Sequence, residues 1–457
     1  MRASVLCSLT LIGYLCSFPP VDLPEAAYVC LVPLIWWASL APAWKPYLLS
    51  CYFVGWGIWF LLLIWLRHVT WGGLFLLSAV MGVFFVLWAA WIRYFFARLV
   101  TLPLFVRLAG LVASASWWII LEWGREAFLW GFPWLPLAAS QWHRPVMLSY
   151  LPWTGAAGLT FVLVFFNLAL ASYLMLQRQR LSNSRGGAAW GFLRLRLCPE
   201  LYVAILLVVG NLVPYMLHVS EQKNQKRANL SLAVVQPNTP IMLKYDAEVV
   251  RQGLKNLRML TLEAAESNPD LIIWPETALT VEYLTGSPPM MRWVEDLVAR
   301  ANVPVLGGAL AHTGEKTHNA LYGIRPEKGV QEDYYAKRQL VPFGEYVPME
   351  EYLPFLRRFV PHEGDLTPGK KTNLLNMRAG SRDWQIGGMI CYEDSFPKLA
   401  RDSVNAGADW LVVVTNNAWF GEEGGAYQHA AHSVLRAVEN RRPVLRVGNA
   451  GWSGWID

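Results

Sequence analysis

The sequence predicts two unlike halves: an α-helical polytopic membrane domain at residues 1–217, followed by an α/β domain at residues 229–457. With 54% hydrophobic residues and 24 tryptophans in 457 positions, the chain is too apolar for a wholly soluble protein and too polar for one that lies entirely in a membrane. The first half holds 17 of these tryptophans and five of the six cysteines, in long apolar runs. The second half alternates short β-rich runs with helix-period segments.

The membrane domain is predicted from a succession of apolar stretches. Most approach the ~20 residues that a helix needs to cross ~30 Å of hydrocarbon. The first is short and could be the apolar region of a signal peptide, but further runs follow it and no small-residue cleavage site stands out. Any single run could be a buried core helix, whereas the series indicates about seven membrane helices, at residues 3–17, 26–42, 47–66, 71–92, 105–123, 155–176 and 200–217.

The positive charges predict the orientation of these helices, because Lys and Arg concentrate in cytoplasmic loops. With the N-terminus inside, the loops on the same side carry most of the charge, and seven crossings deliver residue 218 to the periplasm or its equivalent. The polar stretch "HVSEQKNQKRA" (218–228) is interpreted as a linker. The inside charges are Lys45, Arg93, Arg98, Arg178, Arg180, Arg185, Arg194 and Arg196, against Arg67, Arg125 and Arg144 outside.

The net charge of +6 comes partly from these Lys and Arg residues of the loops. Nucleic acid is not expected as a partner, because no basic patch is interleaved with aromatic residues.

The globular half is predicted to be a layered α/β domain. Helix-period segments lie at residues 247–266 and 427–441, between short β-rich runs bounded by turns. Such folds collect active-site groups where strands end. The β-rich runs are "LSLAVVQ" (230–236), "DLIIW" (270–274), "VPVLGGAL" (303–310), "WQIGGMI" (384–390), "DWLVVVT" (409–415) and "PVLRVGN" (443–449).

Three residues of this half are candidates for chemistry. Cys391 in "GGMICYEDSFP" has no cysteine partner in its own domain, so it cannot form a structural disulfide there, although an inert buried thiol stays an alternative. Glu276 in "LIIWPETAL" and Lys337 in "YYAKRQLVPFGEYVP" could each be an ordinary surface residue. Together they supply what cysteine acyl chemistry requires: a carboxylate to take the thiol proton and an ammonium to stabilise an oxyanion.

These motifs resemble the Glu, Lys and Cys motifs of the nitrilase superfamily, whose fold is an αββα sandwich. Membrane spans ahead of such a domain resemble one family within it, the apolipoprotein N-acyltransferases of bacterial inner membranes. The segments "GFPWLPLAASQ" (131–141), "NNAWFG" (416–421) and "ENRRPVLRVGNAG" (439–451) are also similar to that family's motifs. The likeness covers nearly the whole chain.

The resemblance implies roles for these residues. Glu276 is expected to be the general base, Cys391 the nucleophile and Lys337 the oxyanion stabiliser. Supporting positions are Glu345, Glu393 and Tyr392, whose backbone N–H is a candidate oxyanion donor. Substrate contacts are expected at Tyr245, where many relatives have Trp, and at Phe355 and Leu356.

The implied reaction moves an acyl chain from a phospholipid, typically phosphatidylethanolamine, through a Cys391 thioester to the α-amine of a diacylglyceryl-modified cysteine on an apolipoprotein. A monomer is expected. Two segments that follow the Glu and Lys motifs, "TALTVEYLTGSPPMM" (277–291) and "MEEYLPFLRRFVP" (349–361), are interpreted as mobile arms on the bilayer or, equally, as packed lid loops.

Two rival functions remain open: an anchored amidase or nitrilase that hydrolyses a small-molecule C–N bond, and a catalytically dead membrane scaffold. His429 and His432 have a spacing that could suit a metal, but no third ligand is evident, so neither a metal nor a cofactor is expected. The family usually has another membrane span after the globular domain, and none is expected within this sequence, which ends at "GWSGWID".

Overall fold

The chain forms two compact units in the computed structural model. Unit 1 comprises Met1–Gln225 with Glu422–Ala431, and unit 2 comprises Lys226–Gly421 with His432–Asp457. The structure describes residues 3–128, 131–183, 198–224, 229–239, 247–279, 283–285, 287–359, 366–421 and 423–457.

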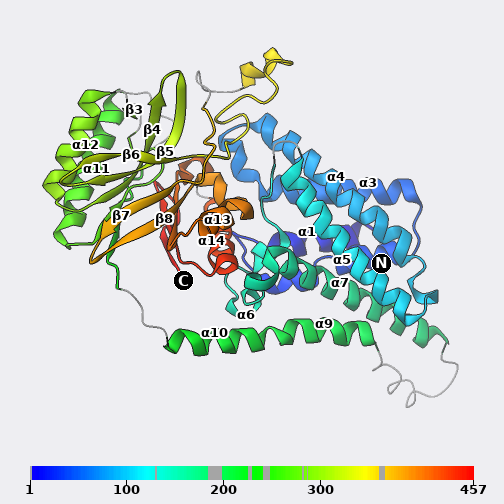
Figure 1. The fold of residues 1–457 in the computed structure, drawn as a ribbon. Coiled ribbons are helices and arrows are strands. Elements are labelled where there is room, and N and C mark those ends of the chain that lie inside the picture. Colours follow the sequence, from blue (N-terminus) through cyan, green and yellow to red (C-terminus); the bar gives the residue numbers. More distant parts are fainter. Residues whose placement is uncertain are drawn as a thin grey trace. The chain divides into compact units, whose positions relative to one another are not determined.

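Unit 1 is helical (Figure 1). Short 3-10 helices connect its longer helices, at Pro24–Tyr28, Ile64–His68, Leu99–Thr101 and Leu137–Gln141 (η4). Its α-helices are α1 (Ala3–Cys16), α2 (Val32–Ser39), α3 (Trp44–Leu62), α4 (Trp71–Phe96), α5 (Leu104–Ala127), α6 (Pro145–Leu148), α7 (Leu151–Asn183), α9 (Pro199–Gly210) and α10 (Leu212–Asn224).

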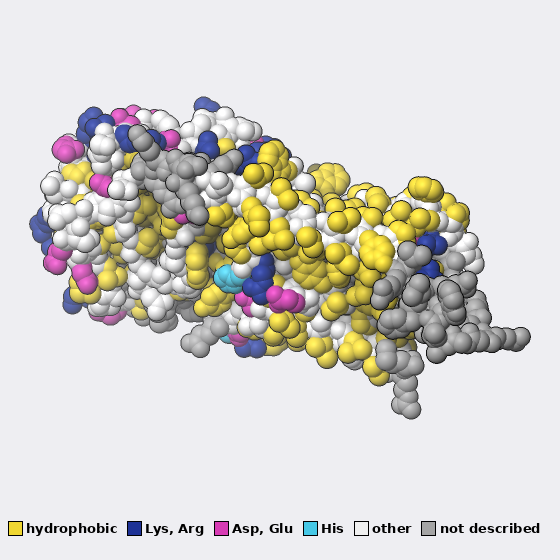
Figure 2. Space-filling model, turned by 90° about the horizontal axis from the view of Figure 1, so that it is seen from below, with side chains coloured by type: hydrophobic (Ala, Val, Ile, Leu, Met, Phe, Trp, Pro, Cys, Tyr) yellow, Lys and Arg dark blue, Asp and Glu magenta, His cyan; other side chains and the backbone are white. Residues whose placement is uncertain are grey.

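Four helical segments among the described residues are long and apolar enough to cross a membrane: Trp71–Phe96, Leu104–Ala127, Leu151–Arg180 and Pro199–Ser220. Large apolar side chains on three of them, such as Phe105, Leu76 and Trp153, are exposed, as expected for surfaces that face lipid. Figure 2 shows such hydrophobic side chains covering much of the helical unit on the side it presents.

The predicted count of seven crossings stays a prediction. α1 is a shorter apolar helix of 14 residues. The predicted span 26–42 is not one continuous helix, because the 3-10 turn at Pro24–Tyr28 ends and α2 begins anew at Val32. Pro33 lies in the first turn of α2, where its missing N–H costs no hydrogen bond. At ~1.5 Å per residue, the eight residues of α2 alone are too short to span ~30 Å.

The predicted domain boundaries need two corrections. Residues 218–224 are not a linker but the last part of α10, because a polar composition with Glu, Gln and Lys also suits a helix. Residues 225–228 lie outside the described part of the chain. In addition, Glu422–Ala431 belongs to unit 1, so residues 229–457 are not one uninterrupted domain.

Gln428, a fully buried residue of this returning segment, has both ends of its amide satisfied within unit 1. Its Oε1 accepts from the indole N–H groups of Trp65 and Trp134 at 3.2 Å each. Its Nε2 donates to the carbonyls of Pro19 and Leu62 at 3.1 and 3.0 Å. An amide side chain can accept two hydrogen bonds at its oxygen and donate two from its nitrogen, and Gln428 makes all four. They fix the segment against the end of the predicted span 47–66, against Pro19 after the span 3–17, and against Trp134.

Unit 2 contains two sheets. The first has the strand order β1-β2-β4-β5-β6 with β3 paired to β4, and the second has the order β11-β10-β9-β8-β7. β1, β2 and β4 are parallel, as are β8, β9 and β10. The strands are β1 (Leu232–Val234), β2 (Leu271–Ile273), β3 (Tyr283–Thr285), β4 (Val305–Thr313), β5 (Lys316–Arg325), β6 (Gly329–Ala336), β7 (Leu374–Ala379), β8 (Arg382–Ile390), β9 (Trp410–Thr415), β10 (Val444–Gly448) and β11 (Gly454–Ile456).

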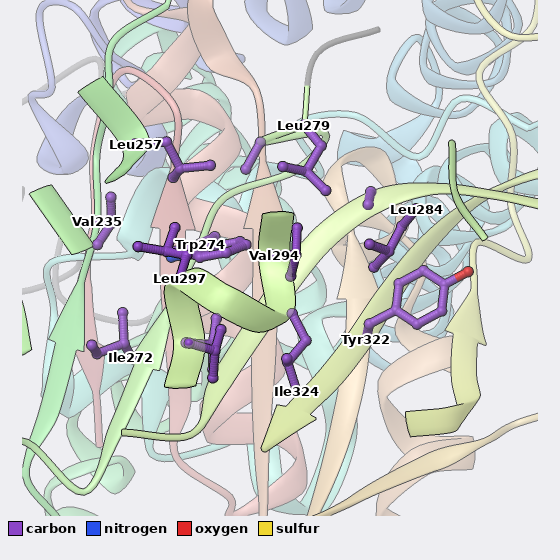
Figure 3. Close-up of a cluster of buried hydrophobic side chains, with 14 of the residues drawn as sticks. Val235, Leu257, Ile272, Trp274, Leu279, Leu284, Val294, Leu297, Tyr322 and Ile324 are labelled. Atoms are coloured by element: carbon purple, nitrogen blue, oxygen red, sulfur yellow. The ribbon is translucent and has the colours of Figure 1, made fainter. Parts of the chain in front are cut away.

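Three apolar clusters separate four layers in unit 2. One, drawn in Figure 3, packs the first sheet against α11 (Ala247–Glu266) and α12 (Pro288–Ala301) and includes Trp274 and Val294. A second fills the space between the sheets. The third packs the second sheet against α13 (Pro397–Asn405) and α14 (Gly425–Asn440). The layers are therefore helix, sheet, sheet and helix, which confirms the expected αββα sandwich.

Candidate active site

The three candidate residues each follow a strand of unit 2, as predicted for Glu276 and Cys391; the strand that ends before Lys337 was not among the predicted β-rich runs. Glu276 lies three residues after β2, Lys337 comes directly after β6, and Cys391 directly after β8. Glu276 and Lys337 are buried, at 7% and 1% exposure, so neither is the surface residue of the alternative interpretation. The turn that carries Glu276 lies against β4, where Ala278 N–H donates to Gly308 O at 2.9 Å. A side chain at Gly308 would place its Cβ 2.9 Å from Glu276 Cα, so this approach requires glycine.

Lys337 lies between two carboxylates. Its Nζ donates to Glu345 Oε1 at 2.8 Å and is 3.4 Å from Glu276 Oε1. Asn319 of β5, which is 2% exposed, bonds to the same two oxygens, at 2.8 Å for Glu276 and 3.3 Å for Glu345. The backbone N–H of Lys337 also donates to Asn319 O at 2.8 Å. The first sheet therefore holds one ammonium and two carboxylates as a single network.

Cys391 begins the 3-10 turn η7 (Cys391–Ser395) in a left-handed backbone conformation, with φ of 54°. This region is uncommon for residues other than Gly, Asn and Asp, and such strain persists only where the surroundings enforce it. The residue Cys391 is partly buried, and its thiol interacts electrostatically with Glu276, Lys337 and Glu345. The structure therefore brings the Glu, Lys and Cys candidates into one neighbourhood.

The buried carboxylate of Glu393 holds this turn from one side. Its Oε2 accepts from Ile390 N at 2.7 Å and from the Tyr335 hydroxyl at 2.8 Å. Its Oε1 accepts from the backbone N–H groups of Arg338 and Gln339, at 2.6 and 3.0 Å. These two residues follow Lys337, so Glu393 ties the nucleophile turn to the lysine loop.

Burial dominates the electrostatics of the site. It raises the pKa of the Cys391 thiol to about 12, with Glu276 raising it further and Lys337 opposing the rise. Burial alone would lower the pKa of Lys337, but Glu345 and Glu276 together raise it above its ordinary value. Burial also raises the pKa of Glu393, against the hydrogen bonds from Ile390 and Gln339. At neutral pH the resting site therefore holds a charged lysine and a protonated thiol.

The other predicted positions differ in their surroundings. Tyr392 is buried, and its ring packs edge-on against Phe396 with centroids 5.2 Å apart, which is a packing role for the side chain. Phe355 is 55% exposed and Leu356 is half-buried, both in the 3-10 turn Pro354–Phe359. Tyr245 lies outside the described residues.

The two predicted arms also differ. In the segment 277–291, residues 283–285 form β3 and residues from 288 begin α12, so its second half is regular structure and not an arm. In the segment 349–361, Met349, Tyr352 and Phe355 are exposed apolar residues, at 46%, 80% and 55%.

Several residues that support the site were not predicted from the sequence. Asn319 and Tyr335 are buried in β5 and β6, but other polar residues precede them in both strands, so no break in an apolar pattern marks either position in the sequence. Among the described residues, no group of three or more His, Cys, Asp and Glu side chains is placed to hold a metal ion. His429 and His432 are both buried on α14.

Comparison with known proteins links both units to described families. Residues 231–456 match the family model for carbon-nitrogen hydrolase, and residues 12–169 match that for the apolipoprotein N-acyltransferase N-terminal domain. A solved CN-hydrolase superfamily protein from Xanthomonas campestris is similar at 23% identity and a TM-score of 0.38, over 50% of this chain and 83% of that one.

Curated relatives named apolipoprotein N-acyltransferase match over most of the chain. The protein from Geobacter metallireducens is 32% identical over 76% of this chain and 64% of its own length. That from Chlorobaculum tepidum is 29% identical over 96% of this chain and 83% of its own length. That from Azotobacter vinelandii is 32% identical over 81% of this chain and 66% of its own length. With its apolar helices and its αββα sandwich, this membrane protein belongs to the apolipoprotein N-acyltransferase family of the nitrilase superfamily.

Proposed function

We propose that this chain transfers an acyl chain from a membrane phospholipid to the α-amino group of the N-terminal S-diacylglyceryl-cysteine of apolipoproteins, through a thioester on Cys391. The observation that carries the proposal is the buried lysine between two carboxylates beside a cysteine, in a chain that also has membrane-length apolar helices. The relatives' name supports an acyltransferase over a hydrolase of small soluble amides.

In the first half-reaction, Glu276 takes the proton of the Cys391 thiol as the sulfur attacks the ester carbonyl of the donor. A base is needed because a thiol with a pKa of about 12 is almost wholly protonated at neutral pH. The carbonyl oxygen becomes an oxyanion, which the Lys337 ammonium stabilises. The intermediate then collapses, the C–O bond breaks, and the lysophospholipid alkoxide takes the proton from Glu276. The acyl group remains on sulfur.

In the second half-reaction, the neutral α-amine of the acceptor attacks the thioester carbonyl. Glu276 takes a proton from the attacking nitrogen, and Lys337 again stabilises the oxyanion. The C–S bond breaks, and the sulfur leaves as a thiolate that recovers the proton from Glu276. The products are an amide on the lipoprotein and a free Cys391 thiol. Glu345 keeps Lys337 charged and oriented through both steps, because it accepts the ammonium's 2.8 Å hydrogen bond.

The donor is proposed to be phosphatidylethanolamine and the chain to act as a monomer, with unit 2 on the periplasmic side of the inner membrane. The exposed apolar residues of segment 349–361, Phe355 among them, suit contact with acyl chains. Topology is tested by labelling single cysteines introduced at Arg185 and Leu230. Labelling of the Leu230 position from the cytoplasm would contradict the orientation and the lipoprotein acceptor together.

The thioester is tested by incubating the purified chain with labelled phospholipid in the absence of an acceptor. The label should attach to Cys391 in a hydroxylamine-labile bond and pass to a diacylated lipopeptide that is added afterwards, in ping-pong order. Cys391→Ala should abolish labelling, and Lys337→Ala should slow it by roughly 10²–10³-fold, the usual effect of losing one oxyanion donor. Rapid release of free fatty acid without acceptor would favour the anchored hydrolase instead.

A further inference from the structure

Arg446 lies among apolar residues on the helix side of the second sheet. Its strand neighbours Leu445 and Val447 belong to the cluster between the sheets, whereas Val444 belongs to the cluster beneath α13 and α14. Because side chains alternate along a strand, Arg446 lies on the same side as Val444. Val413 of β9 is in register with Arg446 and also belongs to the cluster beneath α13 and α14. A fully buried arginine therefore stands where the pattern predicts an aliphatic residue.

The partner of this arginine is Asp394, which is also fully buried. Arg446 Nη1 donates to Asp394 Oδ2 at 2.8 Å and to Ser433 Oγ of α14 at 2.8 Å. The Ser433 hydroxyl in turn donates to Asp394 Oδ2 at 2.6 Å. Nε and Nη2 of Arg446 have no hydrogen-bond partner among the described residues. Within that part of the chain, Arg446 therefore donates only through Nη1, to one carboxylate oxygen and one hydroxyl.

Asp394 belongs to the nucleophile turn, three residues after Cys391. Glu393, its neighbour, is held by the lysine loop and Tyr335, as described above. Asp394 is held from the opposite side, by β10 and α14. Arg436 of α14 adds contacts from its Nη1 to the carbonyls of Asp394 and Ser395, at 3.4 Å each. The left-handed conformation of Cys391 is therefore clamped between two sets of contacts, one on each acidic side chain of the turn.

The charges around Cys391 give this clamp a second effect. Glu276 and Glu345 are both on the side of the first sheet, and the one ammonium there, Lys337, is shared between them. The Arg446 guanidinium interacts electrostatically with both Cys391 and Glu276. Its charge is balanced by Asp394 at 2.8 Å, so the removal of either partner leaves the other as an uncompensated charge beside the nucleophile turn. On α14, the charge of Arg436 is offset by Glu439 at 2.9 Å.

Stability alone gives little reason for such a pair. Replacing a buried ion pair by well-packed apolar residues is often neutral or stabilising, because desolvation of the two charges offsets their attraction. The position of the pair, directly behind the nucleophile turn, points to a role in the chemistry.

We propose that Arg446 and Asp394 are positioning residues for Cys391: Asp394 fixes the nucleophile turn from the α14 side, and Arg446 holds Asp394 and neutralises its charge. The inference rests on the proposed thiol chemistry of Cys391. Neither residue touches the reacting atoms, so the test must separate an electrostatic effect from a loss of packing.

The test is alkylation of Cys391 in the full chain in detergent, with no acyl donor or acceptor present. Neutral iodoacetamide and anionic iodoacetate are compared, and the Cys391 peptide is quantified by mass spectrometry so that the other five cysteines do not contribute. Arg446→Met should slow alkylation by iodoacetamide roughly tenfold, which corresponds to about one unit in the thiol's pKa. It should slow alkylation by iodoacetate further, because the unpaired Asp394 carboxylate repels the anionic reagent.

Asp394→Asn should change the ratio of the iodoacetate to the iodoacetamide rate in the opposite direction, because it removes a negative charge. Arg382→Met is the matched control: it breaks an exposed ion pair with Asp409 in the same sheet and should leave the ratio unchanged. A shift of the ratio in the same direction for Arg446→Met and Asp394→Asn, or no shift for Arg446→Met, would overturn the proposal, because a purely structural pair predicts no dependence on reagent charge.

If Arg446→Met does not fold, Arg446→Lys and Asp394→Asn decide the question. Arg446→Lys keeps the charge and should keep the ratio of the parent chain, and a lowered ratio would count against the proposal. Because alkylation needs no lipid, these results stand even if the chain transfers no acyl group. Failure of acyl labelling with a normal pattern of alkylation would refute the proposed function and leave the positioning role intact.

Discussion

Replacing Asn319 by leucine should weaken both the fold of unit 2 and the proposed acyl transfer, because one amide group supports two carboxylates. Its Nδ2 bonds to Glu276 Oε1 at 2.8 Å and to Glu345 Oε1 at 3.3 Å. A hydrogen bond to a charged group contributes ~1.5–3 kcal/mol, and the longer contact falls at or below the low end of that range. Asn319→Leu should therefore destabilise the chain by roughly 2–4 kcal/mol.

This loss of stability can be followed in detergent by the midpoint of thermal unfolding. For a unit of this size, ~1 kcal/mol corresponds to about 2–4 °C, so the midpoint should fall by roughly 4–16 °C. The acyl transfer rate is measured from a labelled phospholipid to a diacylated lipopeptide. A displacement of the base by ~1 Å can cost ~10²-fold in rate, and the loss should be in kcat more than in KM because Asn319 has no proposed contact with substrate.

Asn373→Leu provides the matched control. The Asn373 amide donates to the neutral carbonyl of Tyr334 at 3.1 Å, away from the carboxylates. Its loss should cost about 1 kcal/mol and leave the transfer rate unchanged. Asn319→Asp should be worse than Asn319→Leu, because it adds a third carboxylate to a buried site with one ammonium. If Asn319→Leu transfers acyl groups as fast as Asn373→Leu, Asn319 does not hold the base in place.

Four further predictions test other parts of the molecule. Gly308→Ala should force the Glu276 turn to move and should lower the transfer rate roughly 10²-fold, with a midpoint that falls less than that of Asn319→Leu; an unchanged rate would show that the turn has room. Gln428→Leu removes four buried hydrogen bonds in unit 1, so its unfolding midpoint should fall well below that of the parent chain. Phe355→Ser should reduce transfer from phospholipid vesicles without lowering the midpoint, because the ring is already 55% exposed; equal losses would indicate a packed lid loop. Finally, since burial raises the pKa of Cys391 to about 12 from 9.0, the native state binds more protons than the unfolded state between these values, and stability should fall as pH rises through them. Cys391→Ser should lack this part of the fall when midpoints are compared at about pH 8 and about pH 10.

The positions of Glu276 and Cys391 were predictable because each follows a β-rich run, whereas Lys337 was proposed from its motif and the strand before it, β6, was not predicted. The ends of β2, β6 and β8, at Ile273, Ala336 and Ile390, lie within three residues of the three candidates. Their meeting in space was not predictable from local pattern. It depends on the order of strands in two separate sheets and on how those sheets stack, and both are set by long-range pairing.

The errors in the first half come from the same limitation. An apolar run at residues 26–42 has the composition of a span, but where the backbone turns depends on prolines and on tertiary partners. Asn167 of α7 accepts from Leu31 N–H at 2.9 Å and donates to Ala27 O at 2.8 Å, which satisfies backbone groups at the break before α2. In the same way, the polar composition of residues 218–224 predicted a linker, although polar residues also extend α10.

Buried polar residues are the part of the site that sequence reasoning misses. Arg446 interrupts the apolar run of β10, whereas Asn319 and Gln428 stand next to other polar residues and are distinguished only by their burial. Burying such a group without hydrogen-bond partners costs free energy. The partners here come from segments remote in sequence, so a short stretch of the chain shows the polar residue but not the groups that satisfy it. The same reasoning can be applied when only a sequence is known. A single polar residue within a strongly apolar predicted strand is a candidate for supporting a nearby nucleophile, because an apolar residue at that position would need no explanation. Arg446 in "VLRVG" is such a position. The ratio of alkylation rates at Cys391 tests whether Arg446 acts on the nucleophile or belongs to an ion pair with a purely structural role.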